Sequence, residues 1–361
     1  MNKYILLLVI ICSLSIYSQK KNALKIGIVG LSHSHVHWLL GNQFDDVEIV
    51  GIAEPNKDLA KRYLDQYQMS MDLLFDTMDE MISKAKPEAV TAFGSIYEHL
   101  EVVEKCAPLG IHVMVEKPLA VSLEHAVKMK DLADKYGIIL LTNYETTWYA
   151  TNHEIYKMVQ EDAIGDLRKI MVNDGHEGPI EIGVNQEFLD WLLDPVQNGA
   201  GALMDFGCYG ANLITWLMHG ERPISVRATT QQIKPDLYPD VDDDATIILQ
   251  YKNMQGIIQA SWNWPFSRKD MEVYGQTGYL IATNGSELRI RLQGDKGETN
   301  KKINDRPKPQ NNPFSYFAAI VRGKLKMEDS DPSSLQNNMI VMEILEAAKE
   351  SARTSKTVYL K

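Results

Sequence analysis

The residue with the clearest chemical potential in this chain is a lysine that follows an apolar run. Lys117 lies in the sequence Glu116-Lys117-Pro118, directly after the apolar residues 111–115. Open α/β sheets bind their ligands at the carboxyl ends of parallel strands, which is where this pattern would place the lysine. A desolvated ammonium there can orient a carbinol and stabilise alkoxide character as hydride leaves. We therefore predict that Lys117 is catalytic rather than an ordinary solvated lysine.

A second pair of chemically active groups lies in a glycine-rich segment, residues 201–212. Asp205 and Tyr209 are four residues apart, so their side chains can point into one cleft if Tyr209 begins a helix. A phenol normally titrates near pH ~10, and a neighbouring cation favours its ionised form. This pattern predicts a proton shuttle at Tyr209 beside Lys117, with Asp205 holding a neighbouring substrate hydroxyl or Tyr209 itself. The alternative is a core tyrosine hydrogen-bonded to Asp205.

The turn after the first apolar run is a candidate for nucleotide binding. Residues 30–35 keep only the first glycine of the Gly-x-Gly-x-x-Gly pattern, with Ser32 and His35 in the other two places. Backbone N–H groups in such a turn, at the start of a helix, can bind a pyrophosphate. We therefore assign cofactor contacts to the first four residues of the turn, Gly30, Leu31, Ser32 and His33.

A carboxylate further along the chain supports this assignment. Glu54 ends the second strand-like run, 24 residues after Gly30, where a carboxylate accepts hydrogen bonds from the ribose hydroxyls of adenosine. A negative charge at that place also repels the 2′-phosphate of NADP. The sequence therefore favours NAD as the cofactor.

Three alternating histidines in the same segment raise the question of a metal site. His33, His35 and His37 would share one face of a strand, but successive helical residues turn by about 100°, so three histidines at this spacing do not converge. No acidic residue follows them before Asp45. We therefore predict no metal and expect the histidines to line a loop around phosphate and nicotinamide.

The composition limits the kinds of partner that this protein can have. The chain has 361 residues, of which 45% are apolar and 24% charged, and its formal net charge is −11. This length predicts two domains, and the negative charge argues against nucleic-acid binding, which needs a basic surface. A small-molecule partner is expected instead. Two of the three cysteines, Cys106 and Cys208, lie in different motifs and are expected to be buried free thiols.

The N-terminal segment, residues 1–18, has the pattern of a cleaved export signal. Lys3 precedes an apolar stretch that is too short to favour a membrane span. We therefore expect a periplasmic or secreted protein whose mature chain begins near Gln19. Cys12 offers lipoprotein anchoring as an alternative, although the bulky residue before it fits that processing poorly.

Patterns of apolar residues divide the rest of the chain into two domains. Strand-like and helix-like runs alternate through residues 24–143, which predicts a doubly wound Rossmann domain with a parallel sheet. Residues 144–361 carry longer successive strands, which predict an α+β domain with a large, mainly antiparallel open sheet. The last predicted helix can also pack back on the first domain. The other expected elements are a surface loop at residues 307–313 and helices at about residues 152–161, 210–218 and 332–352.

Taken in order, these motifs resemble the Gfo/Idh/MocA family of oxidoreductases. The resemblance spans residues 24–360 and rests on the nucleotide turn, His99, Glu116-Lys117-Pro118, Asp205-x-Gly207-x-Tyr209, residues 272–278 and residues 350–358. It implies a Rossmann domain and a second domain whose open sheet packs on a partner subunit in a homo-oligomer. It also implies the oxidation of sugars or cyclic polyols by a bound nicotinamide cofactor.

The resemblance extends to the two candidate catalytic residues. Lys117 corresponds to the catalytic lysine of the family. Tyr209 stands where many members have histidine. The tyrosine form resembles the branch that contains glucose-fructose oxidoreductase and dimeric dihydrodiol dehydrogenase.

Five further residues complete the predicted site. We assign cofactor contacts to Gly94, His99 and Glu116. His176 can offer hydrogen bonds to a sugar, and Trp148 can offer aromatic surface to a sugar ring, although both residues are equally compatible with a structural role in their loops.

These features predict an exported NAD-dependent oxidoreductase that acts on a hydroxyl of a sugar, sugar acid or cyclic polyol in carbohydrate catabolism. Two alternatives stay open. One is a glycosidase in which NAD transiently oxidises the sugar so that elimination breaks the glycosidic bond, and the other is a non-catalytic carbohydrate-binding protein. An exported enzyme has no free nicotinamide pool, so it would have to retain its cofactor and recycle it between paired substrates.

Overall fold

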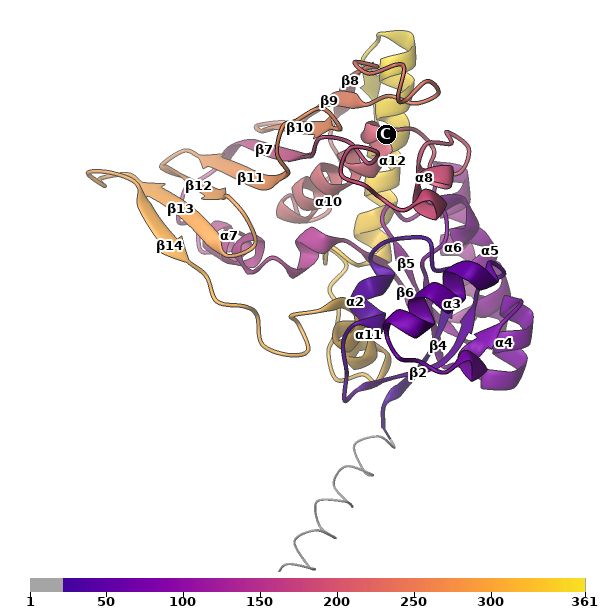
Figure 1. The fold of residues 1–361 in the computed structure, drawn as a ribbon. Helices are drawn as coiled ribbons and strands as arrows, with labels where there is room; N and C mark the ends of the chain where they lie inside the picture. The colour runs from indigo at the N-terminus through magenta and orange to yellow at the C-terminus, as the bar shows by residue number, and fades with distance from the viewer. Residues whose placement is uncertain (1–21, 361) are drawn as a thin grey trace, which may run out of the picture.

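The computed structural model describes residues 22–360, which form two sheets with helices packed against them (Figure 1). The predicted export signal at residues 1–18 and the candidate lipoprotein residue Cys12 lie outside the described residues. A parallel sheet occupies the N-terminal part of the chain, and a larger mixed sheet occupies the C-terminal part. The long helix α12 (Leu335–Thr354) contacts both parts.

The N-terminal sheet confirms the predicted doubly wound topology. Its six strands are parallel and lie in the order β3-β2-β1-β4-β5-β6, which is the order of dinucleotide-binding domains. The strands are β1 (Leu24–Val29), β2 (Val47–Ala53), β3 (Leu74–Phe75), β4 (Ala89–Ala92), β5 (His112–Glu116) and β6 (Leu140–Asn143). The helices between them are α2 (Val36–Leu40), α3 (Lys57–Gln66), η1 (Met71–Leu73), α4 (Met78–Ala85), η2 (Ile96–Glu98), α5 (His99–Cys106), η3 (Ala107–Leu109) and α6 (Leu123–Tyr136).

Local sequence signals explain where several of these helices begin. The side chains of Asn56, Thr77 and Ser122 each accept a hydrogen bond from the backbone N–H three residues later, at the starts of α3, α4 and α6. Such caps satisfy N–H groups that the first turn of a helix leaves without partners. The central strand β4 is buried at every residue, as expected where helices cover both faces of a parallel sheet.

The C-terminal sheet confirms the predicted large, mainly antiparallel domain. Its strands lie in the order β14-β13-β12-β11-β7-β10-β9-β8-β15, and of the described pairs only β7 with β10 is parallel. The strands are β7 (Leu167–Gly175), β8 (Ser225–Gln231), β9 (Asp244–Gln250), β10 (Gln255–Ser261), β11 (Arg268–Gly275), β12 (Gly278–Ala282), β13 (Glu287–Leu292), β14 (Thr299–Lys302) and β15 (Val358–Tyr359).

Helices from several parts of the chain pack around this sheet. Helices α10 and α12 cover one of its faces, since α10 contacts β7 and β10 and α12 contacts β8 (Figure 1). The helices between β6 and β8 along the chain are η4 (Glu145–Trp148), α7 (Ala150–Gln160), α8 (Gln186–Leu192), α9 (Ala202–Asp205) and α10 (Gly207–Leu217).

A helix from the C-terminal part completes the core of the N-terminal sheet. Phe314 and Phe317 of α11 (Pro313–Val321) are buried in one apolar cluster with the residues of β1. The loop expected at residues 307–313 leads into this helix, which Asn312 caps by accepting from the N–H of Ser315. Helix α12 contacts α6 and β6 as well. Residues beyond Asn143 therefore contribute to both cores.

The sequence pattern misses several short elements, and their size and composition explain why. Strands β3 and β15 have two residues each, and β14 is polar and exposed at every residue. Hydrogen bonds to a neighbouring strand, rather than an apolar periodicity, place these segments in the sheets. The pattern also does not predict helices α8, α9 and α11.

Candidate active site

The nucleotide turn lies at the carboxyl end of β1, where the strand order reverses between β1 and β4. Gly30 there has a φ of +75°, and a Cβ atom on it would lie 2.6 Å from the backbone nitrogen of Gly94. Glycine suits this position because it accepts a positive φ and leaves room for the second backbone segment. The turn therefore keeps the close backbone approach of a phosphate-binding loop, although two of the three glycines are absent.

Some backbone donors of the turn are already used within the protein. The N–H of Leu31 donates to Oε2 of Glu54 at 2.9 Å, and the N–H of His33 donates to the carbonyl of Phe93 at 2.8 Å. The expectation that the N–H groups of Leu31 and His33 bind a pyrophosphate is therefore not met in this conformation, because both already donate within the protein. Ser32 keeps a hydroxyl beside the turn, and no acceptor for its N–H is found between residues 22 and 360.

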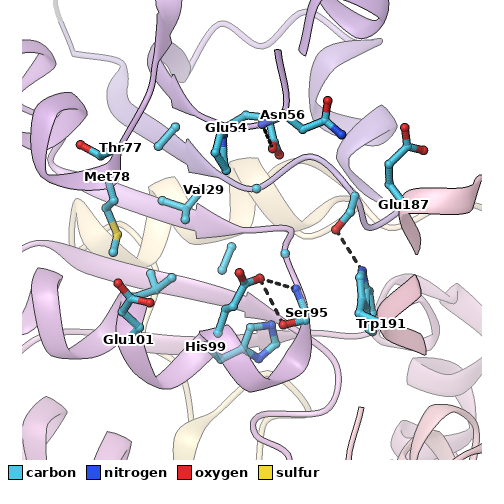
Figure 2. A pocket seen from close by; sticks show the side chains of 18 of the residues that line it. Val29, Glu54, Asn56, Thr77, Met78, Ser95, His99, Glu101, Glu187 and Trp191 are labelled. Carbon is cyan, nitrogen blue, oxygen red and sulfur yellow. Dashed lines mark hydrogen bonds between the residues drawn. The ribbon is translucent and has the colours of Figure 1, made fainter. Parts of the chain in front are cut away.

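A cavity of about 500 Å³ opens beside this turn (Figure 2). The ends of β1, β2 and β4 form one side, and Glu187 and Trp191 of α8 form part of the opposite side. The indole Nε1 of Trp191 donates to Oγ of Ser32 at 3.0 Å, so the C-terminal domain contacts the nucleotide turn directly. Five of the residues predicted to bind the cofactor line this cavity: Gly30, Ser32, Glu54, Gly94 and His99.

Two polar side chains in the cavity wall have distinct electrostatic states. Glu54 accepts N–H bonds from Leu31 and Asn56, and burial raises its pKa. Nδ1 of His99 donates to the carbonyl of Leu119 at 3.1 Å, which leaves Nε2 buried and without a partner within residues 22–360. Burial lowers the pKa of His99 to about 4, so the imidazole is neutral and Nε2 is an acceptor.

These residues fit the adenosine half of a dinucleotide. Gly30 has no side chain, which leaves space for a phosphate beside the turn. The Glu54 carboxylate can accept hydrogen bonds from ribose hydroxyls, and the unpartnered Nε2 of His99 needs a hydrogen-bond donor. Lys117 and Tyr209 do not line the cavity. The nicotinamide half would therefore have to extend beyond the turn to reach them.

Two of the three histidines lie close to a carboxylate, whereas His37 is not part of this group. Helix α2 begins at Val36, so His33 and His35 precede it and are not separated by helical geometry. Nδ1 of His35 lies 2.8 Å from Oε2 of Glu116, and ligand atoms of His33, His35 and Glu116 all lie within 4.8 Å of one another. Burial lowers the pKa of both histidines. The prediction that the three histidines do not all converge is therefore confirmed. Their acidic neighbour Glu116 was not expected, because it comes from a strand distant in sequence, β5. The absence of a metal stays a prediction.

Lys117 follows β5 and is buried, with 5% of its surface exposed. Its ammonium forms an ion pair with the carboxylate of Asp205 and also donates to the backbone carbonyl of Asp205 at 3.1 Å. Nε1 of Trp262 donates to the other carboxylate oxygen at 3.0 Å. Burial opposes the charge of the lysine, but the Asp205 carboxylate outweighs it and raises the pKa of Lys117. Asp205 thus bonds Lys117 and Trp262, and the alternative of a tyrosine hydrogen-bonded to Asp205 is wrong.

Tyr209 lies in the first turn of α10 and is 1% exposed. The centroid of its ring is 5.2 Å from Nζ of Lys117 and 4.9 Å from Nζ of Lys269. Burial, followed by the charges of carboxylates such as Glu145 and Asp205, raises the pKa of Tyr209 well above its usual value. The expectation that a neighbouring cation makes this phenol ionise is therefore wrong, and Tyr209 is a neutral hydrogen-bond donor.

The C-terminal sheet and the helix η4 add three charged residues that the sequence pattern does not single out. Lys269 of β11 forms an ion pair with Glu145, and it pairs across the strands with Asp174 of β7. Asp174 is fully buried. A signal for it exists in the sequence, because Ile170 and Val172 precede it at alternate positions and a carboxyl therefore continues an apolar, inward-facing series.

The two remaining predicted substrate residues have structural partners. Nδ1 of His176 accepts from the N–H of Gly178 at 2.9 Å, and its ring meets that of Phe206 edge-on. Nε1 of Trp148 donates to Asn143 at 3.0 Å, and Asn143 donates to Glu116 at 2.7 Å. Trp148 therefore connects to the buried Glu116. A sugar contact by His176 or Trp148 stays a prediction.

Two protein-family models match consecutive parts of this chain. The model described as "Oxidoreductase family, NAD-binding Rossmann fold" matches residues 24–144, and the model described as "GFO/IDH/MocA C-terminal domain" matches residues 152–281. Together they cover most of the chain. Within residues 22–360, no helix combines the length and the apolar character that crossing a bilayer requires.

Individual relatives are similar to the chain over most of its length. The trans-1,2-dihydrobenzene-1,2-diol dehydrogenase of Xenopus tropicalis is 26% identical over 84% of this chain and 89% of the relative. The myo-inositol 2-dehydrogenase of Thermotoga maritima is 22% identical over 76% of this chain and 80% of the relative. Among solved structures, aldose-aldose oxidoreductase from Caulobacter crescentus, complexed with glycerol, has a TM-score of 0.79 at 23% identity and covers 94% of this chain and 100% of its own.

Proposed function

The chain belongs to the Gfo/Idh/MocA family of NAD(P)-dependent oxidoreductases acting on CH–OH groups, and we propose that it is an exported, NAD-preferring member that oxidises a hydroxyl of a sugar, sugar acid or cyclic polyol. One observation carries the proposal. The ammonium of Lys117, from the Rossmann domain, lies 5.2 Å from the ring centroid of Tyr209, from the C-terminal domain. Sugar and inositol dehydrogenases among the relatives support the choice of substrate class.

The state of these two groups assigns them different parts of the chemistry. A bound nicotinamide supplies the carbon that accepts or donates hydride. The charged ammonium of Lys117 binds the reacting oxygen and stabilises its alkoxide character. In the direction of reduction, the neutral phenol of Tyr209 donates the proton that the new hydroxyl needs. In the direction of oxidation the hydroxyl proton returns to the Tyr209 oxygen, which must then start as a phenolate.

Asp205 has a positioning role in this scheme. Its carboxylate holds the Lys117 ammonium while Trp262 holds the carboxylate, so the lysine has a fixed direction as well as a charge. Burial opposes ionisation of Asp205, but Lys117 lowers its pKa, which keeps both members of the pair charged. An ion pair fixed in this way before substrate binds needs little reorganisation during the reaction.

At the other end, the cavity residues would hold the cofactor. Ser32 and Gly30 would lie against the phosphates, Glu54 against the adenosine ribose, and Nε2 of His99 against a donor of the ligand. The Glu54 carboxylate is the basis for preferring NAD to NADP, because it would repel a 2′-phosphate.

Export and assembly complete the proposal. The signal-like residues 1–18 support a periplasmic or secreted enzyme that keeps its cofactor bound and recycles it between paired substrates. The apolar cross-strand pair Ile248 and Ile257 of the nine-stranded sheet is only partly buried, which supports a homo-oligomer that packs through this face.

Native mass spectrometry of the protein purified from the cell envelope of its host tests these statements together. We expect the mass of a chain cleaved near Gln19, an oligomer, and one copurifying NAD per chain. Adding sugars should then change the nicotinamide absorbance. Protein that carries no nicotinamide and shows no absorbance change with any sugar would contradict the proposal. Release of nitrophenol from a nitrophenyl glycoside without net NAD reduction would identify the glycosidase alternative instead.

A further inference from the structure

A carboxyl group beside the proposed catalytic residues has no partner inside the protein. Asp174 is 0% exposed, and within residues 22–360 neither of its carboxylate oxygens has a hydrogen-bond partner. Buried polar groups are nearly always hydrogen-bonded, and a buried carboxyl without a partner destabilises the folded state. An exception of this kind at the edge of a site indicates a group that is satisfied by a ligand.

The strand register directs Asp174 toward the proposed catalytic centre. It follows Ile170 and Val172 on the face of β7 that α10 covers, and α10 carries Tyr209. Its partner across the antiparallel β7–β11 pair is Lys269. Side chains of directly opposed residues start ~5 Å apart on the same face of a sheet. Asp174 therefore shares its face with the ammonium that lies 4.9 Å from the Tyr209 ring centroid.

Lys269 also marks the side from which a ligand can enter. It pairs with Glu145, which accepts a hydrogen bond from the hydroxyl of Tyr149 at 2.6 Å. The side chains of Lys269 and Glu145 are 23% and 29% exposed, whereas that of Lys117 is 6% exposed. The Lys269–Glu145 pair is thus closer to solvent than Lys117, and a ligand that enters past this pair reaches Asp174 and Tyr209.

We infer that Asp174 and Lys269 form a hydroxyl-binding subsite for a second hydroxyl of the sugar ring that is oxidised at Lys117 and Tyr209. The inference rests on the proposed function. A carboxyl and an ammonium on one face can together bind one hydroxyl, because the carboxyl accepts its proton and the ammonium donates to its oxygen. The substrate class is then a ring with at least two hydroxyls rather than a simple alcohol.

The charge state of Asp174 agrees with this geometry. Burial raises its pKa well above the usual value, although the charge of Lys269 partly opposes the shift. A carboxyl that is protonated in the absence of ligand can donate as well as accept, which suits a hydroxyl. The group is therefore able to bind substrate without the cost of an uncompensated buried charge.

A series of deoxyglucoses tests the subsite in the full-length protein. D-Glucose and its 2-, 3-, 4- and 6-deoxy forms are compared as substrates of the wild type and of D174A. We expect one deoxy position to lower kcat/KM of the wild type by about 10-fold to 100-fold, as expected for a lost hydrogen bond to a charged or strongly polar group. The same deoxy position should have no further effect in D174A. Equal losses in both proteins at every position would overturn the inference.

Two controls separate binding from structure. Asp270 follows Lys269 on β11, so its side chain lies on the opposite face of the sheet, where it bonds Asn173 and Arg268. D270N should therefore leave the effects of the deoxy sugars unchanged. D174N should not lower the melting temperature, because it removes no hydrogen bond within the protein. A clear loss of stability in D174N would assign Asp174 a structural role and contradict the subsite.

Calorimetric titration with the same sugars keeps this test independent of the redox proposal. Failure of the proposed function would appear as the absence of any change in nicotinamide absorbance in the wild type. The selective loss of affinity for one deoxy form would still support the subsite in that case. If the wild type binds none of the five sugars, the subsite inference is overturned as well.

Discussion

The cofactor end of the site and its catalytic end differ in where their residues come from. At the cofactor end, Gly30, Glu54 and Gly94 all follow strands of one parallel sheet, and the turn bonds to neighbouring strand ends. At the catalytic end, Lys117 belongs to the first sheet, Tyr209 to a helix packed on the second sheet, and Asp174 to the second sheet itself.

This difference sets what stabilises each end. Backbone geometry and short hydrogen bonds between neighbouring strand ends maintain the cofactor end. Opposite charges buried between distant segments maintain the catalytic end, where the cost of desolvation is large and each charge depends on its partner. Changes at the cofactor end should therefore act through backbone strain, and changes at the catalytic end through uncompensated charge.

The largest effect is expected for K117M at the catalytic end. Loss of the ammonium should lower kcat by about 10³-fold, because the reacting oxygen loses its cationic partner. Asp205 would remain as a buried charge without its counter-ion, so the free energy of unfolding should fall by about 3–5 kcal/mol. Chemical denaturation of K117M and of K117M/D205N checks this: the double variant should be more stable than the single one and equally inactive. A double variant as unstable as K117M would contradict the role of the ion pair.

The raised pKa of Tyr209 predicts opposite pH profiles for the two directions of the reaction. Oxidation needs the phenolate, which burial makes scarce at neutral pH. We expect kcat for oxidation to rise about tenfold per pH unit between about pH 7 and pH 9, while carbonyl reduction stays nearly constant. Stopped-flow measurements in both directions check the profiles, and Y209F should lose the slope. A plateau of the wild-type oxidation rate near neutral pH would show that the phenol ionises readily.

At the cofactor end, His99 should make stability depend on pH. Its pKa in the folded protein is lowered to about 4, so below the ordinary value near ~6.5 the unfolded chain binds more protons than the folded one. Stability from this group is therefore present above about pH 6.5 and lost as the pH falls toward 4, by at most ~3 kcal/mol. Denaturation of wild type and H99N, which can still donate to Leu119, should show a difference that shrinks in acid. A difference independent of pH would contradict a neutral, buried His99.

Gly30 provides a test of backbone strain. G30A introduces a Cβ 2.6 Å from the backbone of Gly94 at a φ of +75°, whereas G110A has a similar φ of +70° but no atom within 4 Å of the new Cβ. Both variants should carry the strain of a left-handed alanine. G30A should be less stable than G110A by about 2 kcal/mol, because its neighbouring backbone must shift. Urea unfolding compares them, and equal losses would mean that the turn has room for a side chain.

The smallest expected effect compares the same substitution at both ends. W191F removes a hydrogen bond to the neutral hydroxyl of Ser32, and W262F removes one to the carboxylate of Asp205. The first should lower the free energy of unfolding by about 1 kcal/mol and the second by about 2 kcal/mol, because bonds to charged groups are stronger. Thermal and urea unfolding measure both. A larger loss in W191F would reverse the assignment of buried charge to the catalytic end.

Much of the fold follows from patterns within short stretches of the sequence. The parallel sheet over residues 24–143 is predicted because strand-like and helix-like runs alternate there, and the caps at Asn56, Thr77 and Ser122 are local signals. Strand β14 was beyond this reasoning, since its polar residues carry no pattern. Helix α11 joins the first core across nearly the whole length of the chain, which no local window reveals.

The sequence by itself determined which residues are proposed to act: the lysine after a buried strand, the glycine of the turn, and the tyrosine in the glycine-rich segment. These depend on residue type and on spacing along the chain. Only the tertiary structure decided which charges meet, namely Lys117 with Asp205 and His35 with Glu116. The physical reason is that strand register and domain packing set both the neighbours and the burial of each group, and these two quantities determine whether it is charged.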